Sequence, residues 1–233
     1  MIRYVHRDAV AEIVLDMPAN DNKFTYALMN DFIAALERAV ASEAVVLVLR
    51  ATGAHFTLGR DQGEKLVNVS RKDSLKLILK ANGLLRRFSG VSIALVQGRA
   101  MGFGSGLAVQ TDISIAAHDA ILGFDEIRHG LAPLVVLEYL PAYVGPKVAR
   151  ELIFTGRDVS AEEALRLGLV NQVVDAGQLG AAGQALVAEL AGYSAGALRL
   201  IKGFEESLRS SEGEDKGIFA VERLIEWIEA GRP

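Results

Sequence analysis

The sequence predicts a layered α/β protein in which buried β-strands alternate with amphipathic helices. Two apolar runs, 44–50 and 91–97, have the length and composition of strands that are buried on both faces. Segments with an apolar residue at every third or fourth position lie before and after these runs, as expected for helices with one buried face. Alternation of this kind is typical of parallel sheets covered by helices.

The elements expected over residues 10–88 follow from local patterns of apolar residues, caps and breakers. A strand over 10–17 ends at Pro18, and Thr25 can cap the helix that comes next. This helix has an apolar face with a period of 3.6 residues, made by Leu28, Phe32, Ala35, Leu36 and Ala39. A glycine-containing loop over 51–63 follows the strand at 44–50. The next helix, over 70–88, is expected to turn Leu75, Ile78, Leu79 and Leu85 inward and Lys72, Lys76 and Lys80 outward.

The remaining elements divide the chain in two. After the strand over 91–97, a glycine-rich turn over 98–106 leads into a short helix, and strands follow at 112–117 and 121–124. Helices then dominate, over 147–154, 161–167, 178–192, 194–209 and 215–229, with one strand over 169–174. No Pro- or Ser-rich linker separates the two parts. We expect a core over 1–190 and a C-terminal helical region over 191–233.

Composition excludes several functional classes. The 233 residues contain no cysteine, which removes disulfides, thiolate nucleophiles, zinc fingers and iron–sulfur clusters. A net charge of −4 disfavours a general nucleic-acid binder. The four histidines lack metal-ligand spacing, so no metal site is expected. Without an apolar run of membrane-spanning length or a signal-peptide pattern, a cytoplasmic enzyme is expected, with no membrane partner.

The glycine-rich turn over 98–106 is the most informative stretch. It follows a buried strand and opens a helix, and unpaired N–H groups at such a place bind anions or a developing oxyanion. A tight turn that only permits close packing is the alternative. The G-x-G-x-G spacing does not match a dinucleotide fingerprint. Ser105 has Phe103 and Leu107 at the positions where a nucleophile elbow needs glycine.

Two further stretches could reach the same edge of the sheet. The loop over 51–61 also follows a buried strand, so its backbone N–H groups could join those of the glycine-rich turn in a two-donor site. The stretch over 122–130 places Asp125, Glu126, Arg128 and His129 just past an apolar strand. A carboxylate in that position can have a raised pKa and act as a base, although a solvated turn is the commoner arrangement.

Read together, these stretches resemble the crotonase superfamily, the enoyl-CoA hydratase/isomerase family. Residues 17–25 resemble the early R-P-x-x-x-N segment of the family, and 56–61 resemble F-x-x-G-x-D. Residues 97–113 resemble N-G-x-A-x-G-G-G-x-E-L-A-x-x-x-D-I, and 123–127 resemble F-x-x-P-E-I. Residues 154–170 resemble the T-G…A-x-x-A…G-L-V segment. The pieces occur in family order over about residues 10–210.

The resemblance implies a fold, a ligand and an assembly. The fold would be a spiral of ββα turns with a C-terminal helical region used in trimer assembly, giving a homotrimer or hexamer. The ligand would be an acyl-CoA thioester, so that coenzyme A arrives with the substrate and no separate cofactor is needed. The backbone N–H groups of Arg60 and Phe103 would form an oxyanion hole for the thioester carbonyl. Substrate contacts would come from Lys23, Phe24, Leu58, Gly59, Asp61 and Gly102.

The departures from the family pattern decide which reaction is expected. Hydratases of the family use two glutamates, of which the first aligns with Gly106 and the second with Glu126. One carboxylate can shuttle a single proton, so double-bond isomerisation by Glu126 is the expected activity. Glu138, after the bulky segment that begins at Pro133, is a second candidate acid or base. Hydration or other enolate chemistry with Glu138, and an acyl-CoA-binding protein with reduced catalysis, are the alternatives. Met17 replaces the family's early arginine.

Overall fold

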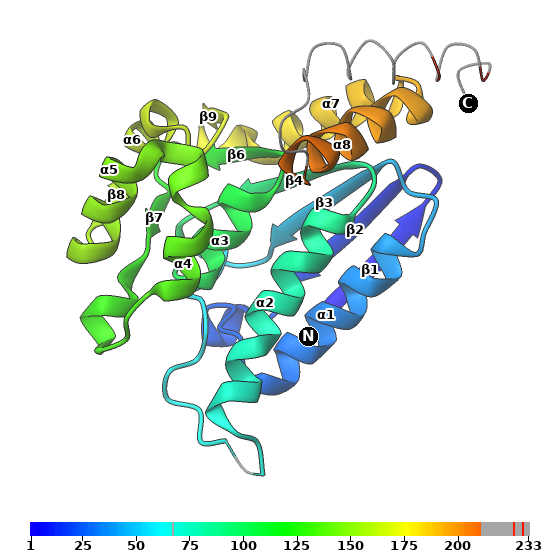
Figure 1. Cartoon of the computed structure of the whole chain (residues 1–233). Helices are drawn as coiled ribbons and strands as arrows, with labels where there is room; N and C mark the ends of the chain where they lie inside the picture. Colours follow the sequence, from blue (N-terminus) through cyan, green and yellow to red (C-terminus); the bar gives the residue numbers. More distant parts are fainter. Residues whose placement is uncertain (67, 211–225, 227–229, 231–233) are drawn as a thin grey trace.

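A six-stranded sheet forms the centre of the fold, with its strands in the order β1-β2-β3-β4-β6-β9 (Figure 1). The structure, a computed structural model, describes residues 1–66, 68–210, 226 and 230, without the side chains of 205–210. Only β1 and β2 pair antiparallel, and every other pair of neighbours in this sheet is parallel. The strands are β1 (Ile2–Arg7), β2 (Val10–Leu15), β3 (Val46–Ala51), β4 (Val91–Val96), β6 (Ile113–Ala117) and β9 (Gln172–Val174).

A second, three-stranded sheet receives the chain as it leaves the first. Its strands are β5 (Arg99–Met101), β7 (Ile121–Gly123) and β8 (Asp158–Ser160). β5 directly follows β4, and β7 directly follows β6, so each turn passes from the large sheet to the small one and then to a helical segment. A parallel bridge between Thr57 and Ala100 continues this pattern in the loop after β3. The predicted α/β spiral of ββα turns is therefore confirmed.

Two long helices lie side by side in front of the large sheet, α1 (Tyr26–Val40) and α2 (Arg71–Arg87) (Figure 1). The predicted cap of α1 is present, because Thr25 Oγ1 accepts a hydrogen bond from Leu28 N. In α2 the predicted inward face is partly wrong: Leu75 and Leu79 are 47% and 51% exposed, whereas Ser74 and Asn82 are buried. The reason is that α2 packs against both α1 and α3 (Phe103–Gln110), so a different side of the helix is covered.

Boundaries differ from expectation where an element is exposed or short. The edge strand β1 was not expected, because it lacks a continuous apolar face: Arg3, His6 and Arg7 are exposed and charged or polar. The helix expected over 147–154 is the last part of α5 (Pro141–Thr155), which is kinked at Gly145 with φ +76°. The strand expected over 169–174 is reduced to β9, because Leu169 N and Val170 N bond to Ala164 O in the turn after α6 (Ala161–Leu167).

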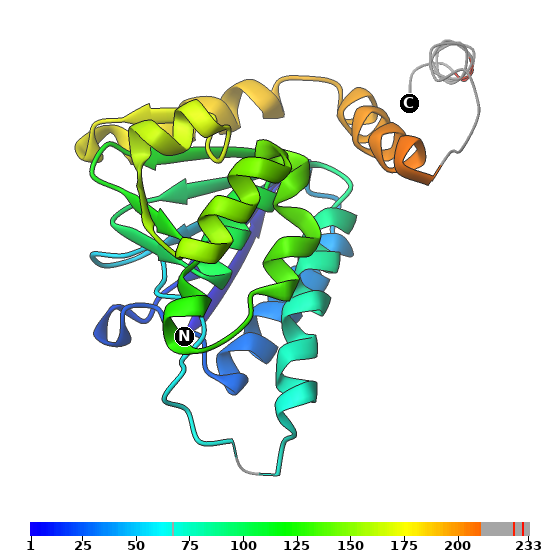
Figure 2. The ribbon, with the colours of Figure 1, turned by 60° about the vertical axis from the view of Figure 1, so that its left-hand side comes forward.

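The last described helices are α7 (Leu179–Ala191), which packs on β4 and β6, and α8 (Ala195–Ser210). Both views place α8 at the opposite end of the molecule from the loop that precedes α2 (Figures 1 and 2). Lys202 Nζ pairs with Asp112 Oδ1 and Arg199 Nη2 donates to Glu43 O, so α8 is tied to the core. The helix expected over 215–229 lies outside the described residues. Within the described part of the chain, no helix is long and apolar enough to cross a bilayer.

The hydrophobic core is one cluster of buried residues that extends along the chain from Ala11 to Leu190. Five short helical segments complete the part of the fold that the structure describes. They are η1 (Pro18–Asn20), η2 (Asp125–His129), α4 (Leu134–Tyr139), α6 and η3 (Ala176–Gln178). Of these, η2 and α4 matter most here, because together with α2 and α3 they surround a cavity.

Candidate functional site

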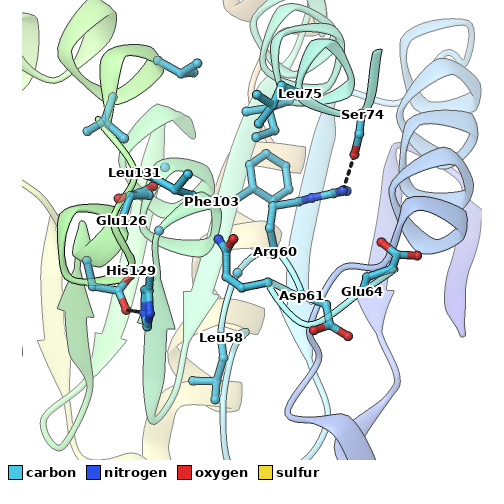
Figure 3. A pocket seen from close by; sticks show the side chains of 18 of the residues that line it. Leu58, Arg60, Asp61, Glu64, Ser74, Leu75, Phe103, Glu126, His129 and Leu131 are labelled. Carbon is cyan, nitrogen blue, oxygen red and sulfur yellow. Dashed lines mark hydrogen bonds and ion pairs between the residues drawn. The ribbon is translucent and has the colours of Figure 1, made fainter. Parts of the chain in front are cut away.

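A cavity of about 450 Å³ lies between α2, the first turns of α3, η2 and α4, with the loop that begins at Leu58 along its remaining side (Figure 3). α2 contributes Leu75 and Ile78, and α4 contributes Val135 and Val136. These four side chains give the cavity two facing apolar walls. Backbone and polar groups of the loop, of α3 and of η2 complete the lining.

Two backbone N–H groups at this cavity, those of Arg60 and Phe103, are available to a ligand. Phe103 is the first residue of α3, where an N–H group has no partner within the helix. Arg60 forms a parallel bridge with Phe24, but the bonds of that bridge use Gly59 O and Asp61 N. Across residues 1–66 and 68–210, no backbone hydrogen bond from either N–H group is found. They are the two N–H groups that the family resemblance implies as oxyanion-hole donors.

Glycines allow the two loops that carry these donors to touch. A Cβ atom at Gly59 would lie 2.6 Å from Met101 O and 3.5 Å from Phe103 N, so the first loop packs directly on the second. A Cβ atom at Gly104 would lie 2.5 Å from Thr57 Cγ2. A backbone bond of 3.0 Å from Met101 N to Thr57 O joins the same segments. The donors are therefore held by main-chain contacts.

Glu126 enters the cavity from η2, on the side opposite Arg60 in this view, with Phe103 between them (Figure 3). Its Oε1 lies 3.1 Å from the position of a Cβ atom at Gly102, so the glycine leaves room for the carboxylate. Its Oε2 is buried and has no hydrogen-bond partner among the described residues. Burial raises the pKa of Glu126, and the charge of Asp125 adds to this, while His129 and a backbone hydrogen bond lower it. A buried carboxylate of this kind can accept and return a proton.

Two polar contacts fix the outer rim of the cavity. His129 Nε2 and Asp125 Oδ2 are 3.1 Å apart at the two ends of η2. Arg60 Nη2 donates to Ser74 Oγ at 2.7 Å, which ties the donor loop to the first turn of α2 (Figure 3). Burial lowers the pKa of the Arg60 guanidinium, against the opposing charge of Glu64. The side chain of Arg60 thus holds in place a loop whose N–H group at this residue has no backbone acceptor among the described residues.

Tyr139, from α4, fills the space beside Gly106. A Cβ atom at Gly106 would lie 2.6 Å from Tyr139 Oη, closer than two such atoms can approach. Burial raises the pKa of Tyr139 far above its ordinary value, and the charge of Glu126 acts in the same direction, so the hydroxyl keeps its proton. The hydroxyl of Tyr139 therefore occupies the space that the Cβ atom of any side chain at position 106 would need.

This packing makes a prediction about stability. Gly106→Ala is expected to lower the free energy of unfolding by about 1–3 kcal/mol, because the new methyl group overlaps a filled site. In a Tyr139→Phe background the same change should be neutral or stabilise by up to about 1 kcal/mol, because alanine favours helix over glycine. Urea unfolding of the four proteins measures both effects. Equal effects of Gly106→Ala in the two backgrounds would contradict the contact.

The predicted site residues fall into two groups. Leu58, Gly59, Arg60, Asp61, Gly102, Phe103 and Glu126 all line the cavity. Three others do not. Phe24 is fully buried against Phe32 and Phe103, with ring centroids 5.3 and 5.2 Å apart, and supports the donor loop through its backbone. Lys23 is half-buried outside the lining, and Glu138 is exposed on α4.

Several polar residues of the cavity were not singled out from the sequence, among them Asn82, Gln110 and Tyr139. Asn82 follows Leu75 and Ile78 at helical spacing, which could have placed it on the same wall. Tyr139 follows Val135 at helical spacing, but this requires α4 to be recognised as a helix. Among the described residues, no group of three or more His, Asp or Glu side chains could hold a metal ion.

Comparison with known proteins gives consistent matches. The model of the family described as "Enoyl-CoA hydratase/isomerase" matches residues 6–216. A protein of Mycobacterium tuberculosis named "Probable enoyl-CoA hydratase EchA12" is 36% identical over 208 residues, which is 84% of this chain and 73% of that protein. Among solved structures, an enoyl-CoA hydratase from Bacillus anthracis has a TM-score of 0.86 at 26% identity, covering 97% of this chain and 91% of the other. One from Mycobacterium smegmatis has a TM-score of 0.89 at 25% identity, covering 96% and 89%.

Proposed function

The chain belongs to the enoyl-CoA hydratase/isomerase family, and from this premise we propose that it isomerises the double bond of an enoyl-CoA thioester with Glu126 as proton shuttle. The observation that carries the proposal is the buried Glu126 carboxylate, whose Oε2 has no partner in the described protein, next to a site where position 106 offers no second acid. One carboxylate with two available protonation states is sufficient for an isomerisation, since the proton removed is later returned.

The reaction would proceed through an enolate. Glu126 removes a proton from the carbon next to the thioester of a Δ3-enoyl-CoA, and the electron pair moves toward the carbonyl oxygen. The N–H groups of Arg60 and Phe103 would donate to that oxygen as its charge develops, and preorganised donors of this type typically contribute about 10²–10³ in rate each. Glu126 then returns the proton at the far end of the conjugated system to give the Δ2-enoyl-CoA. Protons and electrons balance without a further reactant.

The substrate would supply its own coenzyme A, so no separate cofactor is required for this chemistry. Contacts from the loop at Leu58, Gly59 and Asp61, together with Gly102, would position the thioester, because these residues line the cavity around the two donors. The same arrangement would also serve a protein that binds acyl-CoA with reduced catalysis. Turnover distinguishes the two, as described below.

Hydration is the second candidate, and the names of the relatives favour it. Addition of water requires one group to activate the water and another to supply a proton. Tyr139 keeps its hydroxyl proton and lies beside Gly106, so it is the group best placed to assist Glu126 in such a reaction. Glu138 would have to turn from the surface of α4 to take this role.

A mass-spectrometric and absorbance assay with 3-hexenoyl-CoA and crotonyl-CoA tests the proposal. We expect conversion of 3-hexenoyl-CoA to the conjugated isomer and no mass gain from crotonyl-CoA. Conversion of crotonyl-CoA to its water adduct at a comparable rate would establish hydration instead. Binding of both thioesters without turnover of either would establish an acyl-CoA-binding protein.

We also propose that the chain assembles as a homotrimer or hexamer through its C-terminal helical region. The support is the apolar face of α8, where Ile201 is exposed and Leu198, Leu200 and Phe204 are only partly covered. Exposed apolar faces of this kind are commonly buried in assemblies. Light scattering coupled to size-exclusion chromatography is expected to give a mass of three or six chains at micromolar concentration. A monomer under these conditions would contradict the proposal.

A further inference from the structure

The inner end of the cavity is polar, in contrast to its apolar walls. Three uncharged polar residues line it, Asn82 from α2, Gln110 from α3 and Tyr139 from α4. Their position along the cavity follows from the packing of α2 on α3, because Arg86 Nη1 donates to Gln110 Oε1 at 2.9 Å. The turn of α2 that holds Asn82 and Arg86 therefore lies beside the later residues of α3, beyond Phe103 where the backbone donors are found.

Asn82 has an acceptor that the protein leaves unused. The residue is 2% exposed, and its Oδ1 is buried without a hydrogen-bond partner among the described residues. Burying a carbonyl oxygen without a donor is unfavourable, so such atoms are normally paired. Gln110 does not provide the missing donor, because its Nε2 is engaged with Gly106 O and its Oε1 with Arg86. The amide of a residue that lines the cavity is thus left without its full set of hydrogen-bond partners.

Tyr139 supplies a second polar group at the same end. Its hydroxyl lies against Gly106, and Gln110 Nε2 is within 3.7 Å of the same Cβ position, so these groups gather around one turn of α3. A tyrosine hydroxyl both donates and accepts. A ligand hydroxyl, which offers one donor and one acceptor, could therefore bond to the Asn82 amide and to the Tyr139 hydroxyl.

No charged side chain of the described lining comes from the turns at this end of the cavity, which favours a neutral ligand group there. Among the described lining residues, the basic side chains are Arg60, Arg71 and His129, which come from the donor loop, the first turn of α2 and η2. None of them comes from the turns that hold Asn82, Gln110 or Tyr139, and Arg86, which follows Asn82 by one helical turn outside the lining, is engaged with Gln110 Oε1. A carboxylate there would instead meet the field of Glu126, which already acts on Tyr139. A neutral hydroxyl fits better than an acid.

We propose that Asn82 and Tyr139 form a subsite for a hydroxyl group on the acyl chain, so that the substrates are hydroxyacyl thioesters and not simple aliphatic ones. The inference rests on the proposed function, because it takes the thioester oxygen to lie at Arg60 and Phe103. The hydroxyl would then be roughly 5 to 10 Å further along α3, at 1.5 Å per residue from Phe103 to the turn of Gly106 and Gln110. This distance corresponds to a hydroxyl on the fourth, fifth or sixth carbon.

Calorimetric binding of saturated thioesters tests this without turnover. The probes are hexanoyl-CoA derivatives with a hydroxyl on the fourth, fifth or sixth carbon, each compared with the analogue that has a methyl group in its place. For at least one position, we expect the hydroxyl compound to bind roughly tenfold or more tighter, because a site built for a hydrogen bond rejects the analogue that lacks it. Asn82→Leu should abolish or reverse this preference and retain binding of the methyl analogue.

The control is Asn30→Leu, the same exchange at an exposed position of α1, which should keep the wild-type preference. If Asn82→Leu does not fold, Tyr139→Phe gives a second test and should reduce the preference severalfold. Equal binding of hydroxyl and methyl compounds at all three positions would overturn the subsite while leaving the proposed function intact, as would an unchanged preference in Asn82→Leu or in Tyr139→Phe. Failure of every thioester to bind would overturn the proposed function and the subsite with it.

Discussion

Replacing Glu126 by glutamine is expected to reduce kcat for 3-hexenoyl-CoA by roughly 10²–10⁴-fold, the usual contribution of a general base. Glutamine has the shape of the carboxylate but cannot accept a proton. Binding of a saturated acyl-CoA should change little, because the backbone donors at Arg60 and Phe103 and the cavity walls are unaltered. Stopped-flow kinetics and calorimetry on the same preparation measure both quantities.

Glu138→Gln is the matched control, since it makes the same exchange on an exposed residue of α4. It should retain near wild-type turnover. If Glu138→Gln is inactive and Glu126→Gln is active, the base has been misassigned although the fold and ligand class stand. If both variants remain active, the proton-shuttle mechanism is wrong.

The raised pKa of Glu126 gives two pH signatures with defined signs. The carboxylate must be ionised to act as a base, so kcat/KM should fall on the acid side at a pH above the pKa of about 4.3 of an ordinary glutamate. Because folding favours the protonated form, the stabilisation by Glu126 is present at low pH and is lost as pH rises through the raised pKa. Glu126→Gln should therefore gain stability relative to wild type as pH rises, in urea unfolding at several pH values.

Gly59→Ala is expected to cost about 2–4 kcal/mol of unfolding free energy, from a left-handed backbone and an overlap that cannot relax. Gly59 has φ +76°, and its Cβ atom would lie 2.6 Å from Met101 O, a backbone atom. The loop would have to move away from the turn that carries Phe103. We therefore expect activity to fall together with stability, as measured by urea unfolding and by the isomerase assay.

Gly63→Ala is the control in the same loop. Gly63 lacks a positive φ, and its Cβ atom would meet only Asp61 Oδ1, at 3.4 Å. We expect a change of less than about 0.5 kcal/mol, typical of surface positions. If the two variants were equally stable, the contact between Gly59 and Met101 would not be what holds the loops together.

The elements predicted correctly are those whose secondary structure follows from their own residues and does not depend on contacts with distant segments. Thr25 caps α1 and the apolar period of that helix is clear, so its start and its buried face were recognised. β3 and β4 were recognised because both faces of each strand are apolar. β1 was missed because its pairing with β2, and not its composition, makes it a strand. The inward face of α2 was assigned incorrectly in part, because the side of the helix that is buried depends on its packing against α1 and α3.

The candidate site shows the same division. Gly59, Gly102 and Glu126 could be named because they lie in short segments that resemble motifs of the family, and all three residues line the cavity. Asn82 and Tyr139 could not, because their place depends on the register of α2 and α4 against α3. The relation between Gly106 and Tyr139 joins positions 33 residues apart, and only the packed structure brings them into contact.

Main-chain donors have a consequence for the engineering of this protein. Because the N–H groups of Arg60 and Phe103 belong to the backbone, exchanging wall side chains would leave them in place. The walls come from other segments, α2 and α4, through residues such as Ile78 and Val135. A mutant library confined to wall positions of those two helices, with Ser74 kept because it holds the loop of Arg60, could thus alter the acyl pocket while the proposed donors stay in place. The glycines that bring the two loops into contact lie outside both helices and would stay unchanged.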